Sequence, residues 1–353
     1  MKLVDRYIFT KFLRVLIIFC ISIMLFLIIV TIFEKFDDVT ERNLSIFVLI
    51  EYIVYSLPSN LSRSLPSIVL LASIVAMVDL KRHGELLSLF SGGISIYRIF
   101  IPIVILGFMV CILSFTIDQT FGPKFNILAE ERNKLIEGEK EKKVDEVWLR
   151  ISKKMFLKIK KIDKTNNILE NLSIFILDND FSLREKIKAK LAKIKGNLWY
   201  LEDGVRTVYK AKVMTQPFKQ KVYKINKKIE DLEFLTKSPE QLSFFQLKKY
   251  ISELKEGGIN VKKFLVDLYL KLSRPLSNLI MLILGISIAL NMEKSRISYA
   301  IIVAIVLGFF YWVSLSIGVS LGYSEKLPPF LAAWIGNLIF GFINIYLFLK
   351  IRT

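Results

Sequence analysis

Histidine and cysteine are nearly absent from this 353-residue chain, which has one histidine, His83, and two cysteines, Cys20 and Cys111. A single histidine excludes a site built from several histidine ligands and all but excludes a histidine-based catalytic triad. Both cysteines lie inside long apolar runs, where packing in the core or against lipid is their ordinary role. We therefore predict neither a metal site nor a structural disulfide.

Motifs for nucleotide binding and hydrolysis are missing as well. The chain has no GxxxxGK[ST] loop for ATP phosphates and no HExxH zinc motif. An intramembrane aspartyl protease would need two carboxylates at membrane depth, whereas Asp79, Asp118 and Asp267 lie near the ends of apolar runs. We predict a protein that is not an enzyme, needs no cofactor and receives any energy it uses from a partner.

Apolar residues are abundant, at 53% of the chain, and they are segregated from a net charge of +18. A helix needs about 20 apolar residues to cross a bilayer. Six segments meet this length, at about 12–34, 47–80, 98–120, 264–291, 296–321 and 328–350. The first is too long for a signal peptide and no cleavage site follows, so we predict a retained helix. Pro58 and Pro66 predict a kink or break in the second.

Lysine and arginine in the short loops predict the orientation. They occur at the N-terminus, after the second segment, after the fourth and at the C-terminus. The other two short connections, "EKFDDVTERN" and "GYSEKLPP", are mixed or acidic. The positive-inside rule then places both termini in the cytoplasm and residues 122–262 outside it.

The block at 122–262 is polar and carries most of the excess positive charge. "FNILAEERNKLIEGEKEKK" predicts a helix, and "VWLRISKKMFLKIKKI", "LSIFIL" and "KVYKIN" predict strands separated by turns at "DKTNN", "LDND" and "EDG". A further helix, with Ser238 as N-cap and Gly257-Gly258 as its stop, leads back to the membrane. Antiparallel strands at this spacing favour a sandwich or an open barrel.

The predicted fold class is thus an α-helical membrane protein with six transmembrane helices, three on each side of an inserted extracytoplasmic antiparallel β domain. The predicted domains are 1–121, 122–262 and 263–353. The basic β domain suggests acidic ligands or an anionic surface nearby. Nucleic acid is not expected, because the domain lies outside the cytoplasm and lacks clustered aromatic platforms.

The segment "KRHGELLSLFSGG" at 81–93 interrupts two apolar runs. About two helical turns near 84–92 have an apolar side that is too short to span a membrane. One interpretation is an amphipathic helix lying against lipid. The other is a docking helix whose apolar side chains enter a groove on a cytosolic partner, with Glu85 making a charged contact and His83 incidental.

Three cations near the outer ends of apolar runs also allow two interpretations. Lys35, in "TIFEKFDD", is either a lysine reaching the membrane interface or a cation that holds a lipid phosphate. Arg132 and Lys134 are either part of a solvated helix face paired with neighbouring glutamates or further contacts of the same kind.

Several stretches together resemble the LptF/LptG family, the permease subunits of the lipopolysaccharide transporter. They are "VDRYIFTKF", "SLPSNLSRSLP", "KRHGELLSLFSGGIS", "NLWYLEDG", "LVDLYLKLSRPLSNLIMLILGISIAL" and "LGYSEKLPPFLAAWIGNLIF". The resemblance covers essentially the whole chain. No single motif is diagnostic, but the order of the motifs, the 3+3 layout and the inserted β domain are. "DRYI", Lys35 and "LSFFQLKKYISELKEGG" favour the LptG side of the family.

The resemblance implies a jellyroll-like β domain and a function. Such a chain would be a permease subunit of an ABC transporter in the bacterial inner membrane. It would extract lipopolysaccharide, or a similar anionic amphiphile, and pass it to a periplasmic bridge of β-jellyroll domains. The implied partners are a second LptF/LptG-type subunit, a cytosolic LptB-like ATPase dimer, LptC-like and LptA-like bridge proteins, and the lipid itself.

The resemblance also implies roles for particular residues. Lys35 matches a basic residue near the lipid phosphates, while Arg42 and Arg132 are looser matches to headgroup contacts. Glu85 matches the glutamate that faces the ATPase, and the apolar residues of the same coupling segment are Leu86, Leu87, Leu89 and Phe90. Two alternatives remain: another ABC-type permease, such as a lipoprotein-release subunit, and a membrane-anchored receptor or scaffold. The former usually has four helices with its large domain after the first, unlike this chain.

Overall fold

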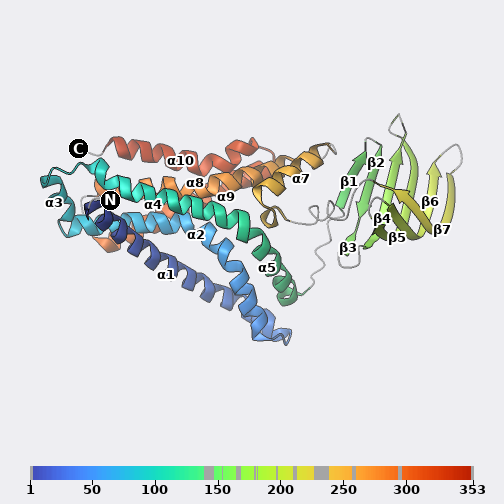
Figure 1. The fold of residues 1–353 in the computed structure, drawn as a ribbon, viewed down its shortest axis with the longest axis horizontal. Coiled ribbons are helices and arrows are strands. Elements are labelled where there is room, and N and C mark those ends of the chain that lie inside the picture. Colours follow the sequence, from blue (N-terminus) through green and yellow to red (C-terminus); the bar gives the residue numbers. More distant parts are fainter. Residues whose placement is uncertain are drawn as a thin grey trace. The chain divides into compact units, whose positions relative to one another are not determined.

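The computed structural model describes residues 3–138, 147–152, 154–163, 168–178, 180, 182–195, 198–209, 213–225, 238–256, 260–292 and 296–350. It divides into two units, which we describe separately. The membrane unit comprises residues 1–138 and 262–353, and the β unit comprises 139–261. Figure 1 shows helices throughout the first unit and a sheet in the second.

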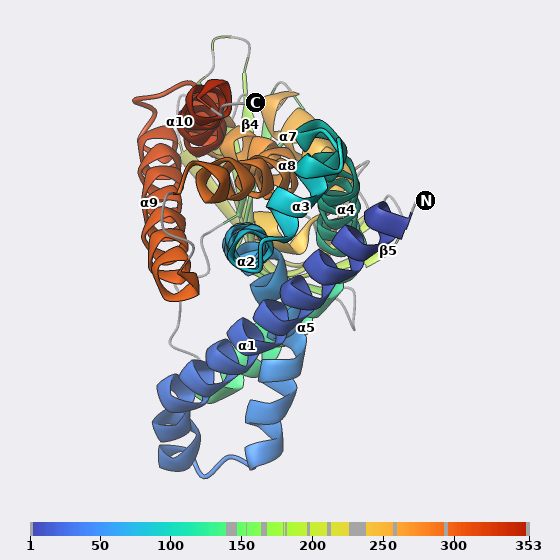
Figure 2. The same cartoon turned by 90° about the vertical axis from the view of Figure 1, so that its left-hand side faces the viewer.

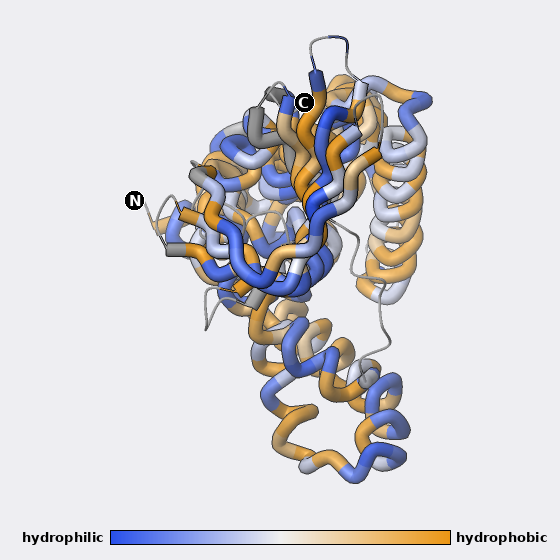
Figure 3. The backbone as a smooth tube through the Cα atoms, turned by 90° about the vertical axis from the view of Figure 1, so that its right-hand side faces the viewer, coloured by the Kyte–Doolittle hydropathy of each residue, from blue (hydrophilic) through white to orange (hydrophobic). Residues whose placement is uncertain are grey.

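The membrane unit contains six helices that are long and apolar enough to cross a bilayer, as predicted. Their elements are α1 (Leu3–Glu41), α2 (Ile46–Arg82), α4 (Ile96–Thr116) continued by η1 (Ile117–Phe121) and α5 (Gly122–Glu137), α8 (Lys262–Asn291), α9 (Ile297–Tyr323) and α10 (Pro329–Leu349). A short helix, α3 (Glu85–Ser91), connects α2 to α4. Figure 3 shows that hydrophobic residues predominate along the spanning helices, whereas the turn between α1 and α2 is hydrophilic.

Helix α8 lies at the centre of the membrane unit, with α2, α4, α9 and α10 around it (Figure 2). The second half of α2 is buried almost completely, because α1, α8 and α9 all pack against it. A Cβ added at Gly285 would lie 1.9 Å from Ser73 Oγ and 3.0 Å from Leu70 O, so glycine allows α8 to approach α2 this closely. The cysteines are unpaired, as expected.

One prediction for the spanning segments is confirmed and one needs correction. Helix α2 continues through Pro58 and Pro66 and changes direction along its length, as Figure 1 shows, so the predicted kink is present and the alternative of a break is not. The third span does not stop near 120, because α4 runs through the π-helical turn η1 directly into α5. Residues 122–137, which the sequence places with the β domain, therefore pack against α2 in the membrane unit.

The β unit contains one seven-stranded antiparallel sheet among its described residues, which confirms the predicted antiparallel domain. The strands are β1 (Val147–Ser152), β2 (Met155–Ile159), β3 (Lys161–Asp163), β4 (Ile168–Leu177), β5 (Leu183–Lys195), β6 (Leu198–Tyr209) and β7 (Val213–Lys224). Their order is β1-β2-β4-β5-β6-β7, with β3 also paired to β4, so neighbours follow one another as in a meander.

Alternation along the strands places one set of side chains in a core. Leu157, Leu172, Ile187 and Trp199 are each exposed by 1% or less. "EDG" at 202–204 is not a turn, because Glu202 and Gly204 pair with neighbours on both β5 and β7. Asp203 takes φ 50° between them, and a Cβ on Gly204 would lie 2.3 Å from Phe218 Cζ. These residues form an irregular point within β6, which local turn chemistry does not reveal.

The helix after the sheet starts later than predicted. Ser238 caps a single 3-10 turn (Pro239–Gln241) through a capping box with Gln241. The helix itself, α7 (Phe244–Glu256), begins after Ser243, whose hydroxyl accepts from the Gln246 backbone N–H. Its predicted stop at Gly257-Gly258 lies outside the described residues.

Candidate functional site: two charged clusters at the ends of α1

The predicted headgroup contacts come together at the C-terminal end of α1. Lys35 Nζ lies 2.5 Å from Glu137 Oε1 at the end of α5, and 5.9 Å from the ring centre of Tyr52 on α2. Arg42 follows the helix, and its guanidinium donates to the backbone oxygen of Glu137 at 2.5 Å. Arg132 Nε lies 2.6 Å from Glu51 Oε2. We call these residues and the two glutamates the Lys35 cluster.

Local backbone structure places Arg42 in this cluster. Helix α1 ends at Glu41, and Asn43 takes φ 52°, which turns the chain sharply toward α2. Gly138, at φ 72°, ends α5, and a Cβ there would lie 2.0 Å from the Arg42 guanidinium. The arginine thus lies directly against the end of α5, where a helix C-terminus presents carbonyl oxygens to a cation.

The Lys35 cluster combines positive charge with nearby apolar surface. Val39, Leu49, Ile53 and Ile136 form a small core beneath it. Large apolar side chains on the same part of α1 and α2 are exposed, namely Phe33, Phe36, Ile46 and Phe47. Lys35 is 16% exposed, so its charge is only partly solvated and its partner carboxylate matters. Such a surface can bind a molecule with an anionic head and apolar chains.

A second cluster lies at the other end of α1 and joins it to α3. Lys11 Nζ lies 2.9 Å from Glu85 Oε1 and 2.9 Å from Asp79 Oδ2 at the end of α2. The Tyr7 hydroxyl donates to Glu85 Oε2 at 2.9 Å. His83 Nδ1 lies 3.2 Å from Asp79 Oδ1 while the ring stays mostly exposed. We call these five residues the Glu85 cluster.

The four apolar residues of the predicted coupling helix divide into two faces. Leu86 is 4% exposed, and it and Leu89 pack into the main core of the membrane unit. Leu87 is 70% exposed and Phe90 39%. Glycines limit α3 at both ends, because Gly84 and Gly93 adopt φ 72° and φ 76°. The helix therefore presents only Leu87 and Phe90 outward, whereas the sequence suggests a single outward apolar side.

Helix α1 connects the two clusters without interruption. From Lys11 to Lys35 it rises by about 36 Å, which exceeds the bilayer core of about 30 Å. Its buried residues are Ile8, Phe12 and Leu16 near one cluster and Val39 near the other. Between Leu16 and Val39 the helix has no fully buried side chain, although Phe19, Cys20 and Ile23 are partly buried against the main core.

The partners within both clusters escape sequence reasoning. Glu137 is 102 residues from Lys35, and Glu85 is 74 from Lys11. The one available signal was that Glu51 and Asp79 are carboxylates near the ends of an apolar run, where a cation partner is common. Within the described part of the chain, no group of three or more His, Cys, Asp or Glu is placed to hold a metal ion.

Comparison with known proteins identifies the family. Residues 6–350 match the family described as lipopolysaccharide export system permease LptF/LptG. The lipopolysaccharide export system permease protein LptG of Haemophilus influenzae is 23% identical over 348 residues, covering 95% of each chain. The protein of the same name from Escherichia coli K12 is 19% identical over 306 residues, covering 85% of this chain and 84% of its own. The chain is a multi-pass membrane protein that belongs to the LptF/LptG permease family.

Proposed function

We propose that this chain is the LptG-type permease subunit of an ABC transporter that moves lipopolysaccharide, or a similar anionic amphiphile, out of the inner membrane. The observation that carries the proposal is the Lys35 cluster, where cations meet exposed apolar surface at the end of a membrane-spanning helix in a chain of this family. A lipid with several acyl chains needs such shielding, because each CH₂ exposed to water costs about 0.8 kcal/mol.

The Lys35 cluster supports headgroup binding by exchange of anions. Glu137 pairs with Lys35 through its carboxylate and accepts a hydrogen bond from Arg42 through its backbone oxygen. A phosphate offers more acceptor oxygens and more charge than one carboxylate, so it competes well for an ammonium and a guanidinium together. We expect lipid phosphate to displace the Glu137 side chain from Lys35, while Arg132 stays with Glu51.

The Glu85 cluster supports a second part of the proposal, the contact with the ATPase that supplies the energy. We propose that Leu87 and Phe90 fill a groove on a cytosolic LptB-like ATPase dimer. Glu85 contacts Lys11 and Tyr7, so an ATPase cation that approaches α3 would compete with Lys11 for this carboxylate. Movement of α3 would then reach the N-terminal end of α1 directly.

The remaining parts of the proposal follow from the family and from charge. The partners would be a second LptF/LptG-type subunit beside this one, and LptC-like and LptA-like proteins that receive lipid from the β unit. Both termini and α3 would lie in the cytoplasm, in agreement with the lysines and arginines of the short loops. The predicted domains 1–121, 122–262 and 263–353 stay part of this proposal, beside the two compact units 1–138 with 262–353 and 139–261.

Photo-crosslinking tests the headgroup role. A benzophenone amino acid at Phe36, next to Lys35, should crosslink to lipopolysaccharide in membranes, and Lys35→Ala with Arg42→Ala should lower that yield at least five-fold. Lys134→Ala is the matched control, because Lys134 lies on the same α5 as Arg132, paired only at the surface with Glu130 at 3.3 Å. Crosslinks confined to protein, or an equal loss in the control, would contradict the proposal.

A further inference from the structure

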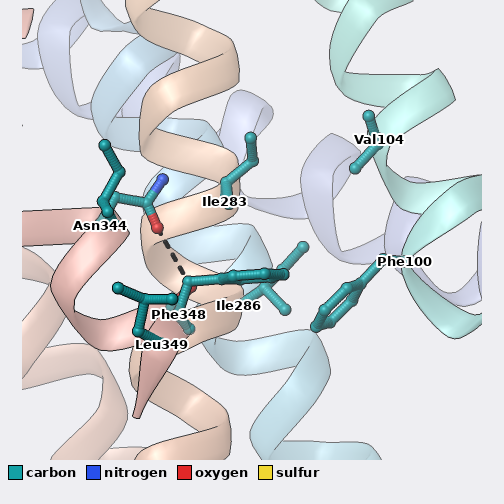
Figure 4. A pocket seen from close by; sticks show the side chains of 9 residues that line it. Phe100, Val104, Ile283, Ile286, Asn344, Phe348 and Leu349 are labelled. Carbon is teal, nitrogen blue, oxygen red and sulfur yellow. Dashed lines mark hydrogen bonds between the residues drawn. The ribbon is translucent and has the colours of Figure 1, made fainter. Parts of the chain in front are cut away.

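An apolar groove lies at the opposite end of the membrane unit from the Lys35 cluster. Its volume is about 420 Å³, within the range of small-ligand sites. Figure 4 shows Phe100 and Val104 from α4 on one side and Phe348 and Leu349 from α10 on the other, with Ile283 and Ile286 of α8 between them. The groove arises because α4 and α10 both pack on α8 and meet each other at the rings of Phe100 and Phe348, whose centres are 6.1 Å apart.

The chemistry of the lining selects an apolar occupant. The two polar residues in it, Ser287 and Asn344, hydrogen-bond to each other at 3.1 Å, as the dashed line in Figure 4 marks. The pair therefore has little need of a polar ligand, and the other lining side chains are aliphatic or aromatic. An unfilled groove of this kind would forgo dispersion contacts along its walls, whereas a flexible hydrocarbon chain restores them.

The position of the groove indicates that the hydrocarbon chain comes from a membrane lipid. All three helices are membrane spans, so hydrocarbon tails rather than water surround the opening. The lining reaches the ends of two spans, at Phe100 and Leu349, and cations stand just beyond it. Lys350 follows Leu349 and is exposed, and Arg98 lies two residues before Phe100, 3.6 Å from Asp5. A headgroup at this end would meet positive charge.

We propose that the groove binds one acyl chain of a resident anionic glycerophospholipid, with its phosphate near Lys350. The ligand belongs to the leaflet at the α3 end, where Figure 1 shows both termini. It is distinct from the cargo of the proposed function, because a headgroup held by the Lys35 cluster is about a bilayer thickness away along α1. The bound chain would fill the space between α4 and α10 and hold α10 against the start of α4.

The test uses the purified full chain in nanodiscs with a phosphatidylglycerol that carries a diazirine near the end of one acyl chain. We expect photolabelled peptides to come from α4, α8 and α10 around the groove. Ile345→Trp should lower this labelling at least three-fold, because the larger ring occupies the groove from its rim, where Ile345 is 59% exposed. Ile305→Trp on α9 is the matched control, at 57% exposed and outside the groove.

Ile283→Trp blocks the groove from its floor and gives a second, independent variant. Lys350→Gln should remove the preference for phosphatidylglycerol over a zwitterionic probe of the same chain length. Equal labelling of α9 and the groove, or full labelling in both tryptophan variants, would overturn the proposal. Recovery of lipopolysaccharide rather than phospholipid from the groove would also overturn it. This experiment measures lipid labelling and not transport. A negative result would therefore leave the proposed function unaffected, and a failure of the proposed function would leave the groove proposal unaffected.

Discussion

The two clusters at the ends of α1 are built from the same kinds of residue but are opposite in charge balance. In the Glu85 cluster one cation, Lys11, forms ion pairs with two carboxylates, Asp79 and Glu85. In the Lys35 cluster one residue, Glu137, contacts two cations, because its carboxylate pairs with Lys35 and its backbone oxygen accepts from Arg42. The first is short of positive charge and the second is short of negative charge. Each is therefore suited to a partner of the charge it lacks.

The difference in charge balance assigns a different kind of partner to each cluster, which the sequence alone does not do. A cluster short of cations can accept a basic side chain from a protein, and a cluster short of anions can accept a phosphate. Because α1 is one continuous helix with no fully buried side chain between Leu16 and Val39, we expect a shift at one cluster to be carried to the other along it. Breaking the helix, or changing the balance at either end, tests this comparison.

The largest effect should come from interrupting α1 between the clusters. Ser22 lies in the stretch without fully buried side chains, and proline there removes one backbone hydrogen bond at a cost of about 3 kcal/mol in a helix interior. Both clusters keep their residues, yet the rigid connection between them is lost. We expect Ser22→Pro to lower lipid export at least ten-fold while ATPase association persists, measured by export in reconstituted proteoliposomes and by co-purification.

Ser22→Ala is the control for that variant, because it removes only the side-chain hydrogen bond to the Ile18 carbonyl. It should export normally. Export by Ser22→Pro at the level of the unmodified chain would show that α1 does not carry the coupling.

Substitution of the shared lysine should have the next largest effect. Lys11→Met leaves Asp79 and Glu85 facing each other without their common cation, and like charges repel at this distance. We expect α3 to lose its fixed position, ATPase co-purification to fall several-fold and membrane insertion to stay intact. Glu85→Lys should do the same, while Lys11→Arg should retain most of the association. Normal association in both Lys11→Met and Glu85→Lys would exclude a coupling role for this cluster.

Removal of one carboxylate at each end gives the sharpest contrast. Glu137→Gln leaves Lys35 without its ion-pair partner, so anionic lipid no longer has to displace a carboxylate. We expect lipid to bind two- to five-fold more tightly, measured by lipid titration in detergent. Glu85→Gln should instead weaken ATPase association, because a partner cation loses its target. If both substitutions weaken binding, the two clusters are merely structural ion pairs.

The sequence predicts features whose signal is local. Hydropathy located six spans because the length of an apolar run is itself the physical requirement. Alternation located β1, β2 and part of β7 for the same reason, whereas β5 was not predicted. The register between helices leaves no such local signal. The sequence suggested Lys35 and Glu85 by position and Arg42 through resemblance, but gave no indication of Glu137, Lys11 or Tyr7 as their partners. The prediction of a turn at "EDG" was wrong for a related reason. Strand pairing on both sides of β6 outweighs the local turn preference of these residues.

An ion pair in the β unit is the reference for a purely structural role and should show the smallest effect. Arg206 donates to Glu185 at 2.5 and 2.9 Å, and Tyr223 donates to the same carboxylate at 3.3 Å. The guanidinium holds the pKa of Glu185 below its usual 4.5, and burial raises the pKa of Tyr223 to about 12. Because the folded pKa of Glu185 is lowered, its contribution is present above pH 4.5 and is lost as the pH falls through the lowered value.

Glu185→Gln should therefore destabilise the β unit by about 1–2 kcal/mol at neutral pH, the scale of a charged hydrogen bond that solvent partly screens through the exposed side of Arg206. Hydrogen exchange of β5 and β6 in the full chain measures this, and the difference from the unmodified chain should shrink as the pH falls through the lowered pKa of Glu185. Lys193→Gln, which removes a more exposed pair with Glu202, should cost less. Because neither substitution touches α1, export and ATPase association should stay unchanged. A loss of export from Glu185→Gln would mean that charge pairs in this chain affect transport through stability alone, and the contrast between the two ends of α1 would then lose its functional meaning.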